Sequence, residues 1–121
     1  MNEKFIQNLD KLPADVRRQF ALLANQYGEK KKQSTIQNDF LSFVKHVWPD
    51  FVEGKHHKRI ADKFNKLASG EIKRLIINMP PRHTKSEFGS YLLPAWMVGK
   101  NPKLKIIQST NTTELSVRFG R

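Results

Sequence analysis

The sequence of 121 residues contains no cysteine. This absence excludes disulfide bonds, zinc sites built on thiolates and thiol catalysis. No apolar run approaches the roughly 18 residues that a membrane-spanning helix requires. The residues from Met1 to Phe5 also lack the charged and then apolar layout of a secretory signal. We therefore expect an intracellular protein that is not secreted.

Hydrophobic residues make up only 38% of the chain, and 11 acidic residues stand against 22 lysines and arginines. The resulting formal net charge of +11 concentrates anions and favours phosphate-rich partners, either nucleotides or nucleic acid. A lysine-rich, solvated surface would give the same totals. Charge alone therefore leaves both interpretations open.

Helical patterns dominate the first 70 residues. A short helix is expected after Pro13, followed by a basic turn at residues 27–32 that we interpret as a linker. A second helix, capped by Ser34 or Thr35, should span residues 36–47 and end before Pro49. A third helix is expected from about residue 56 to residue 68, with Gly70 as its stop.

The pattern changes at residue 74. Residues 74–79 and 104–110 are short runs rich in branched apolar residues, which predict strands buried on both faces. Between them residues 86–98 predict a helix that Pro94 should kink or shorten, and a further helix is expected from Thr112. This order predicts an α/β fold, in which N-terminal helices precede the strand–loop–helix–strand of a parallel sheet.

Residues 80–86 have the context of a phosphate-binding loop. Backbone amides and a helix N-terminus hold phosphate oxygens, a lysine reaches the outer phosphates, and a hydroxyl binds Mg²⁺. Lys85 and Ser86 have the right spacing for the last two roles. The usual pattern places glycines at the positions of Met79 and Thr84, and a β-branched residue such as Thr84 resists positive φ. A basic turn between strand and helix is the alternative interpretation.

The run from Arg74 to Ser86 resembles the nucleotide loop of the large terminase subunits of tailed bacteriophages, whose variant loop reads Pro-Pro-Arg-His-Gly-Lys-Ser. The similarity covers residues 36–121, with matching stretches at residues 56–62, 69–71, 109–115 and 119–121. The resemblance implies a P-loop ATPase that packages viral DNA in the cytoplasm of the host cell. Thr84 is the departure from the family loop.

The resemblance also implies residue roles. Lys85 would hold ATP phosphates, the Ser86 hydroxyl would bind Mg²⁺, and Arg82 would contact the γ-phosphate as a catalytic residue. The implied phosphate site consists of Pro81, Arg82, His83, Thr84, Lys85 and Ser86. Three residues upstream of the loop, Trp48, Phe51 and His56, would line an adenine pocket. For Trp48 and Phe51 the alternative is packing in the core. The adjacent histidines at 56 and 57 do not predict a metal site, because no carboxylates complete a ligand set.

The partners implied by the resemblance are double-stranded DNA, the portal protein, the small terminase subunit and other copies of the chain. No apolar run ends in the paired acidic residues that ATP hydrolysis requires, and no carboxylate cluster could form the family's nuclease site. We therefore expect a flexible segment over residues 1–33 and part of an ATPase domain over residues 34–121. The alternatives are part of a helicase-like P-loop ATPase, or a basic nucleic-acid-binding module without ATPase activity.

Overall fold

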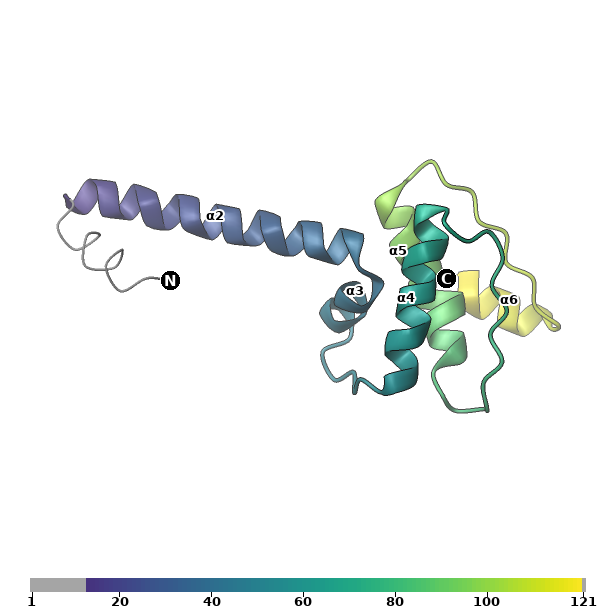
Figure 1. Ribbon diagram of the computed structural model, residues 1–121. Helices are drawn as coiled ribbons and strands as arrows, with labels where there is room; N and C mark the ends of the chain where they lie inside the picture. The colour runs from purple at the N-terminus through teal and green to yellow at the C-terminus, as the bar shows by residue number, and fades with distance from the viewer. Residues whose placement is uncertain (1–12, 121) are drawn as a thin grey trace. The chain divides into compact units, whose positions relative to one another are not determined.

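The computed structural model describes residues 13–120, which form helices joined by irregular segments (Figure 1). The chain divides into two compact units, Met1–Ser34 and Thr35–Arg121. The predicted flexibility of residues 1–12 lies outside the described residues. The helices are α2 (Ala14–Asn38), α3 (Phe40–Val47), α4 (Lys55–Ser69), the π-helical η1 (Glu87–Leu92), α5 (Leu93–Lys100) and α6 (Thr113–Gly120).

Helix α2 begins directly after Pro13, as predicted, and the Arg17 N–H donates to the Pro13 carbonyl. It then continues for 25 residues, so the turn predicted at residues 27–32 and the helix start predicted at Ser34 or Thr35 are both wrong. Glutamate, lysine and glutamine favour helix, and they carry the helix past the single Gly28. None of the α2 side chains is buried.

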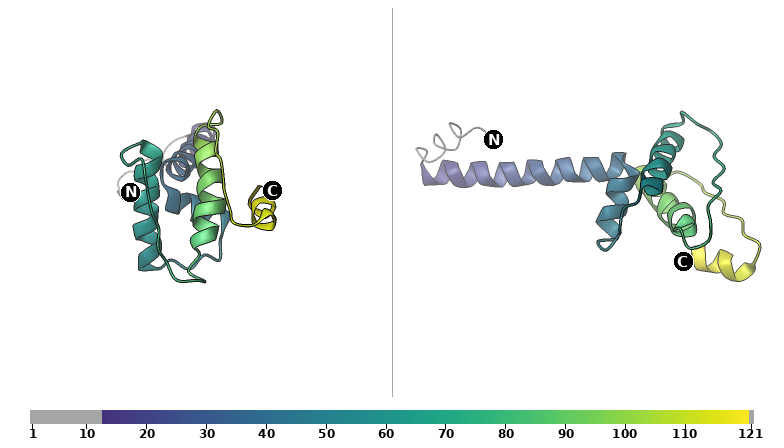
Figure 2. Two further views of the ribbon diagram at one scale, coloured as in Figure 1. Left: turned by 90° about the vertical axis from the view of Figure 1, so that its right-hand side faces the viewer. Right: turned by 60° about the horizontal axis from the view of Figure 1, so that its bottom comes forward.

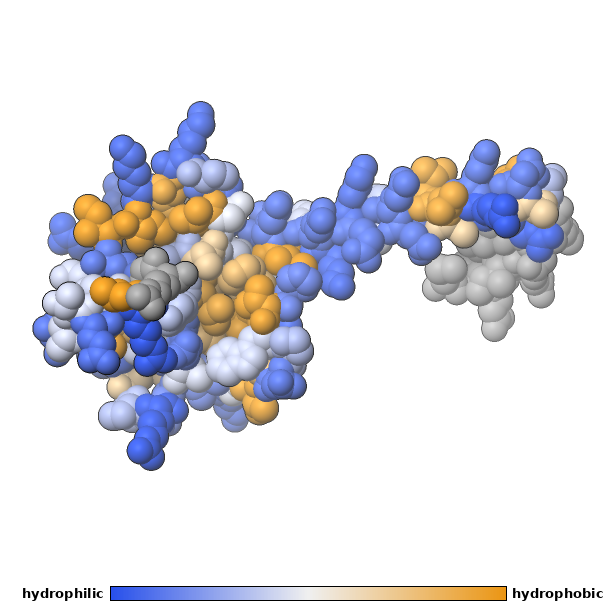
Figure 3. Space-filling model, turned by 180° about the vertical axis from the view of Figure 1, so that it is seen from behind, coloured by the Kyte–Doolittle hydropathy of each residue, from blue (hydrophilic) through white to orange (hydrophobic). Residues whose placement is uncertain are grey.

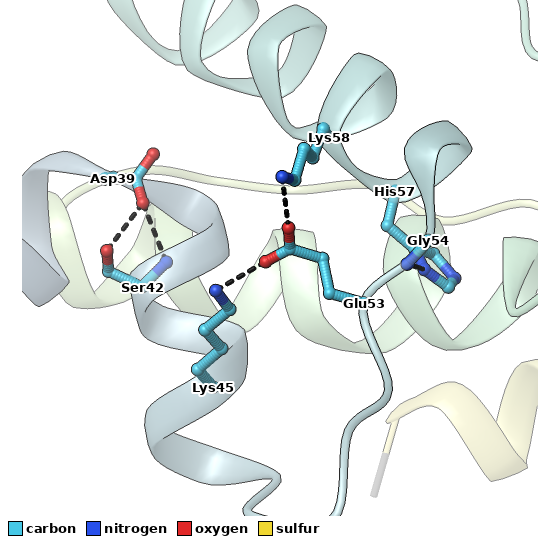
Figure 4. A network of polar contacts seen from close by, with 7 residues as sticks. All are labelled: Asp39, Ser42, Lys45, Glu53, Gly54, His57 and Lys58. Carbon is cyan, nitrogen blue, oxygen red and sulfur yellow. Dashed lines mark hydrogen bonds and ion pairs between the residues drawn. The ribbon is translucent and has the colours of Figure 1, made fainter.

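Asp39 separates α2 from α3 and caps the start of α3 (Figure 4). One carboxylate oxygen accepts from the Ser42 N–H at 2.7 Å and from the Ser42 hydroxyl at 2.6 Å. The other accepts from the Asn65 side-chain amide of α4 at 2.9 Å, while the Asn65 side-chain oxygen accepts from the Phe40 N–H. Partial burial raises the pKa of Asp39, but these hydrogen bonds outweigh it and lower the pKa below its usual value. The N-cap therefore also fastens α3 to α4.

An aromatic core lies among α3, α4, η1 and α5, which pack together in Figures 1 and 2. The ring of Phe40 is fully buried, and it meets Phe64, Phe88 and Trp96 edge to face at centroid distances of 5.0, 5.4 and 5.5 Å. Edge-to-face pairs bring the positive edge of one ring against the negative face of another. Trp96 also donates its ring N–H to the Ile36 carbonyl at 3.1 Å, so its one polar atom is satisfied.

Helix α4 confirms the prediction at both ends to within a residue or so. It starts after Gly54 and ends at Gly70, which adopts φ 80° and donates its N–H to the Leu67 carbonyl. A left-handed conformation costs glycine nothing, because there is no Cβ to clash with the carbonyl.

The predicted parallel sheet is wrong for the described residues, because none of residues 13–120 belongs to a β-strand. Residues 74–79 and 104–110 run without regular structure (Figure 2). Leu75 and Ile77 pack against the core, whereas Ile76 is 86% exposed and Ile107 is 95% exposed. Figure 3 shows hydrophobic residues among hydrophilic ones on one face of the molecule. A branched apolar run favours a strand only where another strand supplies hydrogen bonds and cover, and these two segments do not supply them to each other.

The helix predicted over residues 86–98 is present from Lys85 to Lys100, with η1 as a wider π-helical stretch inside it. Pro94 does not end it, and the helix changes from π-helical to α-helical at Leu93, the residue before the proline. Proline has no N–H to donate to a carbonyl of the preceding turn, and the Ser90 carbonyl lies in that turn. That carbonyl accepts from the side-chain amide of Gln108 at 2.7 Å. The turn before the proline is thus bonded to residues 104–110 from outside the helix.

Val44 offers a test of the core, because it is fully buried on α3 while Val47, one turn later, is 48% exposed. Val44→Ala removes two buried methyl groups and leaves a cavity, and we expect it to lower the free energy of unfolding by about 2 kcal/mol. Val47→Ala is the matched control, expected to change it by less than about 0.5 kcal/mol. Urea unfolding followed by circular dichroism measures both. Equal losses would contradict the described core.

Candidate functional site

The loop between residue 79 and η1 has an unusual backbone. Arg82 and Thr84 adopt φ values of 65° and 59°, and they are the residues other than glycine with positive φ in the part of the chain that the structure describes. Left-handed residues among right-handed ones turn successive backbone N–H groups toward one side, which makes an anion-binding concavity. The sequence indicated that Thr84 would resist this conformation, and the structure shows that it adopts it.

A helix begins where the loop ends. Its first residues are Lys85 and Ser86, and the Phe88 N–H bonds back to the Thr84 carbonyl at 2.9 Å. The N–H groups in the first turn of a helix have no partner within the helix and carry the positive end of its dipole. Lys85, Ser86 and Glu87 thus bring three such groups to the end of the loop.

These elements enclose a cavity of about 420 Å³. Its lining consists of Met79, Pro80, Pro81, Arg82, Thr84, Lys85, Ser86 and Glu87. Neither Arg82 nor Lys85 forms an ion pair with an acidic side chain in the described part of the chain. Glu87 contributes the one carboxylate of the lining, and it lies 3.8 Å from the guanidinium of Arg118. Cations and backbone donors therefore dominate the cavity.

The structure gathers most of the predicted phosphate-site residues, with one exception. His83 does not line the cavity, and its Nδ1 lies 2.9 Å from the Pro81 carbonyl instead. That contact closes the turn across residues 81–83. The His83 side chain therefore contacts the backbone of the loop and not the cavity.

Sequence reasoning missed the role of His57, which is buried at the start of α4. Its Nδ1 accepts from the Gly54 N–H at 2.9 Å (Figure 4), so the ring proton must reside on Nε2. Nε2 therefore donates to the Thr84 hydroxyl at 2.8 Å, and that hydroxyl donates to the His83 carbonyl at 2.6 Å. The available signal was a histidine three residues after a helix-capping glycine, a position that reaches back to the cap.

Burial lowers the pKa of His57, and the neighbouring His56 and His83 lower it further, although Glu53 acts in the opposite direction. Glu53 itself pairs with Lys45 and, at 2.8 Å, with Lys58 (Figure 4). These ion pairs lower the pKa of Glu53 and raise that of Lys58. His57 is thus held neutral, as its two hydrogen bonds require.

The three residues of the predicted adenine pocket do not line the loop cavity. Trp48 packs against Phe51 at 5.5 Å, and Phe51 in turn contacts the ring of Phe88 at 5.4 Å, so both belong to the margin of the core. His56 is exposed, and its ring centroid lies 3.8 Å from that of the tilted His57 ring. It lines a second cavity of about 370 Å³ beside residues 75–79. A role for these residues with adenine stays a prediction.

The basic residues of helix α4 lie at exposed or half-buried positions, and acidic neighbours offset several of them. Lys58 pairs with Glu53, Lys63 approaches Asp62 at 3.9 Å, and Lys66 lies 3.3 Å from Glu71. Exposed pairs of this kind contribute little to stability, but they reduce the local positive field. The helix is therefore less cationic than its sequence indicates.

No family model, curated protein or solved structure matches this chain. In the described part of the chain, no helix combines the length and apolar character that crossing a bilayer requires. Among the same residues, no group of three or more acidic, histidine or cysteine side chains gathers as a metal site.

The neutral state of His57 predicts how stability depends on pH. Because the folded pKa is below the unfolded value of about 6.5, the unfolded chain binds more protons as the pH falls. Stability from this group is complete above pH 6.5 and is lost as the pH falls through the folded pKa. We expect the free energy of unfolding to decrease between pH 7.5 and 5.5, and His57→Gln to flatten that decrease. An identical pH profile for both proteins would contradict the assignment.

Proposed function

We propose that the loop of residues 79–87 binds the phosphates of ATP together with Mg²⁺. We further propose that the chain is the ATP-binding part of a viral terminase large subunit, which drives double-stranded DNA into a procapsid. The observation that carries the proposal is the cavity in front of a helix N-terminus, lined by Arg82, Lys85 and Ser86. The likeness of residues 74–86 to terminase loops supports ATP as the ligand.

The chemistry of the loop favours a polyphosphate over a single carboxylate or sulfate. Two cationic side chains and the first N–H groups of a helix converge on one cavity of about 420 Å³. Oxygens of successive phosphates can share these donors, because amides hold one phosphate while a long lysine side chain reaches the next. Arg82, held at positive φ within the loop, is the residue we propose for contact with the γ-phosphate.

The residues present fit a magnesium ion that is brought in with the nucleotide. Mg²⁺ keeps several waters and typically binds one or two protein oxygens besides phosphate oxygens. The Ser86 hydroxyl lines the cavity and supplies such an oxygen. When bound, the metal would neutralise phosphate charge, while Lys85 and the loop amides orient the chain of phosphates.

DNA is the second part of the proposal, and the net charge of +11 supports it. The ion pairs along α4 argue that a DNA contact on that helix would centre on Lys55 and Arg59, for which no acidic partner is found among the described residues. The portal protein and the small terminase subunit are proposed as partners only because the sequence resembles terminases. A basic module that binds nucleic acid without nucleotide is the competing function.

Lys85→Ala tests the phosphate site. A hydrogen bond to a charged group contributes about 1.5–3 kcal/mol, so we expect the affinity for Mg-ATP in isothermal titration to fall at least about tenfold. Lys103→Ala, which removes the same charge from the turn after α5, should leave the affinity unchanged within about twofold. Tight DNA binding with a steep salt dependence and no effect of nucleotide would favour the competing function.

Ser86→Ala tests the metal contact. Chelation of Mg²⁺ should weaken ATP binding to the natural protein, and the same chelation should matter much less in Ser86→Ala, because that variant lacks the hydroxyl ligand. Ser90→Ala is the matched control, since Ser90 lies one turn further along η1 and contributes its carbonyl, rather than its hydroxyl, to a hydrogen bond. A variant at Ser86 that keeps the full dependence on Mg²⁺ would exclude this role.

A further inference from the structure

We propose that His57 is a positioning residue for the phosphate loop, and that it acts through the Thr84 hydroxyl to hold residue 84 in the left-handed conformation. The inference rests on the proposed function of residues 79–87, because it assigns to helix α4 the control of that site. It explains how a β-branched residue can stand where phosphate loops commonly have glycine.

The backbone of Thr84 is the first reason. A β-branched residue at φ 59° is a true outlier, since its Cβ substituents crowd the neighbouring carbonyl oxygen. Such conformations persist where the surrounding contacts over-determine them. Here the surroundings act on one atom, the Thr84 Oγ1, which lies 2.8 Å from His57 Nε2 and 2.6 Å from the His83 carbonyl.

The rigidity of His57 is the second reason. Its Nδ1 accepts from the Gly54 N–H, and its ring lies 4.8 Å from the Phe51 ring and 5.0 Å from the Phe88 ring. One hydrogen bond and two aromatic contacts thus hold the imidazole ring in place independently of its hydrogen bond to Thr84. A donor held in this way can restrain Thr84, whereas a freely rotating side chain would follow the loop.

Direction is the third reason. The hydrogen bonds form one chain with a single direction. The Gly54 N–H donates to His57, His57 donates to Thr84, and Thr84 donates to the His83 carbonyl. Each group donates or accepts as its chemistry allows. A charged imidazolium carries a proton on both ring nitrogens, so it could not accept from the Gly54 N–H. Thr84 also lends its carbonyl to the Phe88 N–H at 2.9 Å, so its conformation sets where the helix begins. His57 therefore controls the direction of the donors that face the cavity.

The Phe88 amide gives a readout that needs no nucleotide. Its hydrogen exchange reports whether the Thr84 carbonyl stays in place, and we expect Thr84→Val to raise the exchange rate about tenfold. Thr84→Ser keeps the hydroxyl and should restore the rate to within about twofold of the natural protein. Thr113→Val, the same substitution at the exposed start of α6, is the control and should change nothing.

A double-mutant cycle separates positioning from general destabilisation. His57→Phe keeps a ring in the core but removes both polar atoms, so it should raise Phe88 exchange and weaken Mg-ATP binding about as much as Thr84→Val does. Both substitutions break the bond between His57 Nε2 and Thr84 Oγ1, so the effect of the double variant should be clearly smaller than the product of the two single effects. If His57→Phe does not fold, the comparison of Thr84→Val with Thr84→Ser decides alone.

Two results would overturn the inference. One is unchanged Phe88 exchange in Thr84→Val, and the other is a double variant whose effects multiply. Failure of the proposed function looks different, because the natural protein would then not bind Mg-ATP although the substitutions still raised Phe88 exchange with the same coupling. That result would retain His57 as the residue that sets the loop and would remove ATP as its ligand.

Discussion

The burial of the Phe40 ring is the interaction on which the rest of this structure depends. Phe40 follows directly after the Asp39 cap, and its ring touches one aromatic side chain from each of α4, η1 and α5. A single side chain thereby joins α3 and α4 to the continuous helix formed by η1 and α5. The polar contacts around Asp39 and Asn65 fix where this ring enters, because they tie the start of α3 to the middle of α4.

The same aromatic core also holds the candidate site in place. Phe88 is buried against Phe40 and lies in the first turn of the helix that closes the phosphate loop. On its other side Phe88 meets the His57 ring, which reaches Thr84. The C-terminal end of the loop is therefore held twice, by a helix whose first buried residue is Phe88 and by a hydrogen bond from α4 to Thr84. Rigid support of this kind keeps donors aimed at a ligand before it arrives.

The sequence allowed the helices to be predicted far better than the segments between them. The ends of α4, the start of α2 and the helix around Trp96 follow from local signals such as Gly70 and Pro13. The two apolar runs at residues 74–79 and 104–110 were wrongly predicted as strands, because strand formation depends on partners that a local pattern cannot reveal. Likewise Lys85 and Ser86 were found from spacing, whereas His57 was not, because its contact with Thr84 joins residues 27 positions apart.

Proline inside a helix usually counts as a defect, yet the turn that precedes Pro94 here serves as an attachment point. The Ser90 carbonyl in that turn accepts a hydrogen bond from outside the helix, from the Gln108 side chain at 2.7 Å. Residues 104–110, which form no sheet, are thereby anchored to the helix that follows the phosphate loop. A turn with an irregular pattern of internal hydrogen bonds thus holds a second segment that has no regular structure of its own.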